Sequence, residues 1–89
     1  MLDKVKLALR IKSSAFDDEI NELIESAKLD LSISGVKTDD LNNPLIIHAI
    51  KIYCKANFGL DNKDAEKYYK SYVLLKEHLS LCKEFTNNV

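Results

Sequence analysis

Two histidines and two cysteines are the side chains best suited to chemistry in this chain. His78 and Cys82 are four residues apart, so a helix places them one turn apart on one face. His48 and Cys54 are six residues apart and fall on different faces of a helix. Zinc is held by three or four converging ligands, and this pattern offers only two. The spacing therefore predicts packed free thiols and partly exposed histidines, with no metal site and no cofactor.

Catalytic patterns are also missing from the sequence. Gly35 and Gly59, the two glycines, stand at expected helix ends and not in a phosphate-binding loop. No order of Ser, His and Asp suggests a triad, and the acidic residues 17–22 have the spacing of a helix N-terminus, not of a calcium loop. The four tyrosines could stack on bases. Three of them fall on or beside an expected core face, which favours packing. We expect a protein that is not an enzyme.

Helices must position these residues, because Gly and Pro are scarce and strand-type alternation is absent. Eighty-nine residues make one domain, and an apolar fraction of 46% excludes a disordered chain. A chain of this size buries only about 60% of its unfolded surface and gains stability from oligomerisation. We predict an all-α fold: one compact domain over residues 1–89, with four helices around a buried third helix and a short first helix.

Start and stop signals divide the chain into these four helices. The first is expected over residues 2–9. The second is expected over about 16–34, after capping serines and three acidic residues, with Gly35 as its C-terminal glycine. The third begins at Asn43-Pro44, a strong N-cap followed by the preferred first residue, and stops before Gly59. The fourth is expected from a cap within residues 61–64 to about residue 84.

The third helix, residues 44–58, is the one around which the chain is organised. His48, Lys51 and Lys55 share a narrow strip of it, and almost every other position is apolar. A surface helix has the opposite proportion. We expect a central helix with one open basic edge. That edge could be solvated, could face DNA or could face an acidic neighbour, and the acidic neighbour is favoured.

The second and fourth helices each carry apolar residues outside their main apolar stripe. On the second helix these are Leu29 and Ile33. On the fourth helix a second stripe lies about 120° from the first, formed by Leu74, His78, Leu81 and Phe85. One neighbour cannot cover both stripes of the fourth helix. Either the first helix covers the second stripe, or another subunit does, and a subunit or partner contact is favoured.

Charge is unevenly distributed along the chain. Residues 1–12 carry four basic and one acidic side chain, residues 13–43 two and eight, and residues 44–89 seven and five. The net charge of −1 argues against a DNA-binding domain, which usually has a basic excess. A dipolar chain can dock on copies of itself, although the same charges also fit ordinary solvated helix faces. Neither a signal peptide nor a membrane-spanning run is predicted.

Four short segments carry a family resemblance: LRI at residues 9–11, DDEI at 17–20, NPL at 43–45 and YCKANFG at 53–59. Their order resembles the small head–tail connector, or adaptor, proteins of long-tailed bacteriophages and prophages, often labelled DNA-packaging proteins. The resemblance covers nearly the whole chain. Outside these segments it rests on generic amphipathic helix.

The resemblance implies a helical subunit that assembles with itself into a ring, a dodecamer in the virion. The ring would dock under the portal protein at the head–tail junction, extend the DNA channel and receive the tail or a stopper protein. DNA would be channel content without sequence-specific binding. The chain would be made in the host cytoplasm. The alternative is a small DNA-packaging accessory or protein-binding adaptor.

Overall fold

The computed structural model describes residues 1–59 and 63–86 of the chain. In chain order the elements are α1 (Leu2–Leu9), the short 3-10 helix η1 (Ser14–Phe16), α2 (Asp17–Ile33), α3 (Pro44–Asn57), α4 (Ala65–Ser80) and the short 3-10 helix η2 (Lys83–Phe85). Extended pairing in these two described ranges is limited to an isolated antiparallel bridge between Val36 and Thr86. The predicted all-α fold with four helices is confirmed.

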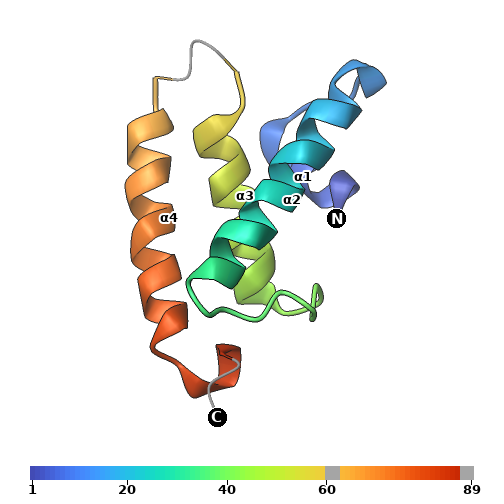
Figure 1. Cartoon of the computed structure of the whole chain (residues 1–89). Coiled ribbons are helices and arrows are strands. Elements are labelled where there is room, and N and C mark those ends of the chain that lie inside the picture. Colours follow the sequence, from blue (N-terminus) through green and yellow to red (C-terminus); the bar gives the residue numbers. More distant parts are fainter. Residues whose placement is uncertain (60–62, 87–89) are drawn as a thin grey trace.

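The central place of α3 is also confirmed. It lies between α4 on one side and α1 and α2 on the other (Figure 1), and it packs against all three. It contributes more buried residues than any other helix: Ile46, Ala49, Ile50, Ile52 and Cys54. The neighbours leave His48 exposed and cover Lys51 and Lys55 in part.

The observed ends of α2 and α3 lie within one residue of the predicted ends. They are determined by capping residues next to each helix. The Ser13 Oγ accepts a hydrogen bond from the Ala15 backbone N–H at 3.0 Å and so begins η1, which continues into α2. The Asn43 Oδ1 accepts one from the Leu45 N–H at 3.0 Å, with Pro44 as the first helical residue. Gly35 follows α2 with φ +87°, a left-handed backbone that glycine adopts without strain.

The end of α4 differs from the prediction. The helix stops at Ser80, whereas the sequence pattern extends it to about residue 84. Cys82 is extended, with φ −96° and ψ 121°, and the chain then turns through η2. The Lys37 N–H donates to the Phe85 carbonyl at 2.7 Å, and Thr86 bridges to the buried Val36. Residues 36 and 37 in the loop after α2 thus pair with residues 85 and 86. We infer that these contacts stabilise the chain end more than another turn of helix would. Of the expected cap within residues 61–64, positions 61 and 62 lie outside the described residues, and Asp64 is the N-cap residue of α4.

None of the helices in the described ranges combines the length and apolar character needed to cross a membrane.

Candidate assembly surfaces

The outward side of α4 presents large apolar side chains to solvent. Leu74 is 68% exposed and Leu81 is 85% exposed, and His78 between them is exposed as well. α1 packs on α3 and α2 and leaves these residues uncovered. The alternative in which α1 covers the second stripe of α4 is therefore wrong. We call Leu74, His78 and Leu81 the α4 face.

Phe85 does not belong to the α4 face. It lies in η2, beyond the end of the helix, and is half-buried against the core. The predicted four-residue helical stripe is wrong at this position, because the helical spacing on which it depends ends at Ser80.

His78 and Cys82 do meet, although Cys82 lies beyond the end of α4 and not on the helix as its spacing predicts. The Cys82 Sγ lies 4.0 Å from the His78 Nε2. No group of three or more potential metal ligands is present among residues 1–59 and 63–86. Cys54 is fully buried in α3, and burial raises the pKa of its thiol to about 12, so this thiol is protonated and inert near neutral pH.

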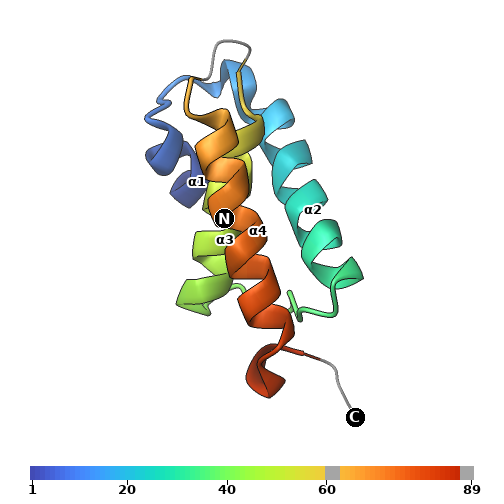
Figure 2. The same ribbon diagram turned by 90° about the vertical axis from the view of Figure 1, so that its left-hand side faces the viewer.

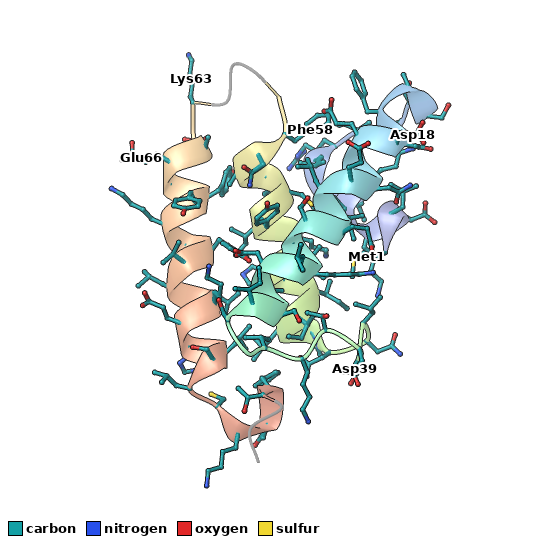
Figure 3. The ribbon with its side chains drawn as sticks, viewed as in Figure 1. Met1, Asp18, Asp39, Phe58, Lys63 and Glu66 are labelled. Carbon is teal, nitrogen blue, oxygen red and sulfur yellow. The ribbon has the colours of Figure 1, made fainter. Side chains whose placement is uncertain are left out.

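The outer side of α2 carries one stripe of exposed side chains, acidic in its first half and apolar in its second. Its residues recur at helical spacing and are all exposed: Asp18, Glu22, Glu25, Leu29 and Ile33. The first three are acidic and the last two are apolar, with exposed fractions of 63% for Leu29 and 77% for Ile33. Figure 3 shows Asp18 at the edge of the molecule, near the start of α2. We call these five residues the α2 outer stripe.

The predicted basic edge of α3 is narrower than the helical wheel indicates. His48 is exposed, whereas Lys51 and Lys55 are half-buried. The Lys55 Nζ lies 5.3 Å from the centre of the Tyr68 ring of α4, a cation–π distance. Lys55 lies near the C-terminal end of α3 and lines a hollow together with Ala8 and Arg10 at the end of α1.

A basic hollow at that end of α3 was not predicted from the sequence. It is open to solvent and lies between the end of α1, the segment after it and α3, lined by Lys6, Leu7, Ala8, Arg10, Ile11, Lys12 and Lys55. Lys6 forms an ion pair with Asp17 at 2.8 Å, so it ties α1 to α2. We call Arg10, Lys12 and Lys55, with the exposed Leu7 at the rim, the basic groove. Its residues come from two separate segments, so no local motif marks it.

Arg10 in the groove has an unusual backbone. Its φ of 60° and ψ of 40° lie in the left-handed region. Within residues 1–59 and 63–86, no other residue apart from glycine has a positive φ. The conformation ends α1, because the Arg10 N–H donates to the Leu7 carbonyl at 3.1 Å and the Ile11 N–H to the Lys6 carbonyl at 2.9 Å. Glycine usually fills this position, and a side chain there costs about 1–2 kcal/mol.

A polar cluster between α2 and α4 contrasts with these open surfaces. The Tyr72 hydroxyl donates to the Asp30 Oδ2 at 2.5 Å, and the Lys76 Nζ donates to the same oxygen at 3.0 Å. The Tyr53 ring of α3 meets the Tyr72 ring edge to face, with centres 5.1 Å apart. We call Asp30, Tyr53, Tyr72 and Lys76 the polar junction.

The pKa values in the polar junction fit a structural role. Burial acts to raise the pKa of Asp30, but the hydrogen bonds from Tyr72 and Lys76 and the Lys76 charge together lower it. Burial, followed by the bond to Asp30, raises the pKa of the Tyr72 hydroxyl. Asp30 therefore stays charged and Tyr72 stays neutral, which joins α2 to α4 rather than preparing a proton transfer.

Comparison with known proteins identifies a family. A family model described as phage connector protein matches residues 1–86, which include all four helices. No curated protein and no solved structure matches the chain significantly.

Proposed function

The chain belongs to the phage connector protein family, and from this premise we propose that it is a ring-forming structural subunit of the virion head–tail junction, without a catalytic site. In this role it docks under the portal protein, extends the DNA channel and receives the tail or a stopper protein. The expected ring is a dodecamer.

The observation that carries the proposal is the exposure of large apolar side chains on two helices. Leu29 and Ile33 lie on α2, Leu74 lies on α4, and Leu81 is the residue that caps the end of α4. Exposed apolar residues that gather on one face mark interaction sites, whereas scattered ones do not. A subunit of a closed ring needs two different contact patches, one for each neighbour, and further surface for the portal and the tail. The two separate apolar faces can supply part of this surface, for a neighbouring subunit, the portal or the tail.

Electron microscopy of the purified chain mixed with its cognate portal protein tests the proposal. We expect ring-shaped density added to one end of the portal. Leu81→Asp should lower ring occupancy, because it places a charge where an apolar contact is expected. Asn42→Asp, which adds a charge at an exposed loop position outside both apolar faces, is the matched control. Portal images unchanged by an excess of the chain would contradict the proposal.

A further inference from the structure

The basic groove and the α2 outer stripe are complementary. The groove presents Arg10 and Lys12 beside Lys55, with Leu7 79% exposed at its rim. The stripe presents three acidic residues followed by Leu29 and Ile33. Each patch combines charges of one sign with an exposed leucine. Interfaces arranged in this way orient the partners and reject wrong pairings.

We propose that the basic groove of one copy receives the α2 outer stripe of the next copy. This inference rests on the proposed ring function and identifies the surface through which subunits join. The α4 face takes no part in this contact.

The positions of the two patches permit a head-to-tail contact. Figure 2 shows α1 and α2 on opposite sides of α4, and the groove is lined by residues at the end of α1, whereas the stripe lies on α2. The ion pair between Lys6 and Asp17 joins α1 to α2 within one copy and leaves Asp18 and Glu22 facing outward. Two different patches on different sides propagate from copy to copy, as a ring requires.

The charge of the whole chain favours a second copy over DNA as the occupant of the groove. The net charge is −1, whereas DNA-binding domains usually carry a basic excess. The same stripe on another copy supplies carboxylates that can pair with Arg10 and Lys12.

The backbone of Arg10 is an independent observation in favour of a functional groove. A left-handed residue that is not glycine is strained, and such strain gathers at functional sites. Glycine would end α1 without strain but would remove the guanidinium from the groove.

Paired charge reversals test the contact. The groove variant is Arg10→Glu with Lys12→Glu, and the stripe variant is Asp18→Lys with Glu22→Lys. Each variant alone places like charges together, and we expect its self-association to be at least about tenfold weaker than that of the wild type. An equimolar mixture should recover association, because each groove then meets a stripe of opposite charge.

Self-association is measured by sedimentation and by NMR shifts over a dilution series reaching about 1 mM, which detects millimolar dissociation constants. Lys67→Glu with Lys83→Glu is the matched control, since both lysines are exposed and lie outside the groove and the stripe. It should associate like the wild type. If the groove variant unfolds, Arg10→Gln with Lys12→Gln replaces it and should weaken association to a smaller degree.

Three results would overturn the proposal: a wild type that shows no concentration dependence, charge variants that associate normally, or a mixture no better than its components. If the groove variant associates normally but loses binding to duplex DNA, DNA is the occupant.

Rings on the portal formed equally well by both charge variants would refute this contact and leave the proposed function intact. Association without any portal ring would refute only the function.

Discussion

Leu29 and Leu31 are two residues apart on α2 and meet opposite environments. Leu31 is fully buried against the core around α3, whereas Leu29 is 63% exposed on the α2 outer stripe. The inner side of the helix accounts for the fold of one copy, and the outer side adds little to it. An exposed leucine on the same stripe as three carboxylates is better explained by a contact outside the subunit than by the stability of the subunit.

The charged groups of the molecule show the same division. Asp30 in the polar junction is held by Tyr72 and Lys76. Asp18 and Glu22 of the α2 outer stripe, and Arg10 and Lys12 of the basic groove, are instead exposed at the surface. These four charges are thus separate from the charges that join α2 to α4. The following predictions test this division, beginning with the largest effect.

The two leucines should differ most in unfolding experiments. Leu31→Ala removes a buried side chain, and we expect it to lower the free energy of unfolding by about 3 kcal/mol. Leu29→Ala, the matched control on the same helix, should change it by less than about 0.5 kcal/mol. Urea titration followed by circular dichroism measures both. Equal losses would show that the outer side of α2 is packed in the free subunit.

The polar junction should make stability depend on pH in the acidic range. The folded-state pKa of Asp30 is lowered. Its contribution to the free energy of unfolding is therefore complete above the pKa of the unfolded chain, about 3.9. This contribution is lost as the pH falls through the folded-state pKa. Asp30→Asn should cost about 1 kcal/mol near neutral pH, because the carboxylate is partly exposed. It should also flatten the dependence of stability on pH below about 4.

Asp39→Asn is the control for this experiment, because Asp39 is an exposed loop residue. It should keep the acidic slope of the wild type. Thermal melts from pH 2 to 7 provide the measurement. An Asp30→Asn slope identical to that of the wild type would mean that the junction does not couple to folding.

Arg10→Gly should stabilise the subunit while weakening its assembly. Removing the left-handed strain should gain about 1 kcal/mol, partly offset by the greater freedom of glycine in the unfolded chain. Arg10→Ala removes the same charge and keeps the strain, so it should weaken association without raising the melting temperature. Melting and dilution experiments on the same samples separate the two effects. A lower melting temperature for Arg10→Gly would contradict the strain argument.

The sequence by itself determined the features that depend on neighbouring residues. Asn43 and Pro44 begin α3, and Gly35 ends α2, because caps and left-handed glycines act within one turn. The nearly continuous apolar character of α3 identified it as the central helix. The open apolar residues of α2 and α4 also followed from helical spacing.

Only the tertiary structure decided the features made by distant residues. α4 ends at Ser80 because the tail finds partners in the loop at Val36, and Asp30 meets Tyr72 across 42 residues of sequence. The basic groove combines Arg10 with Lys55. Such contacts depend on how the helices are arranged, and spacing along one helix carries no information about that arrangement.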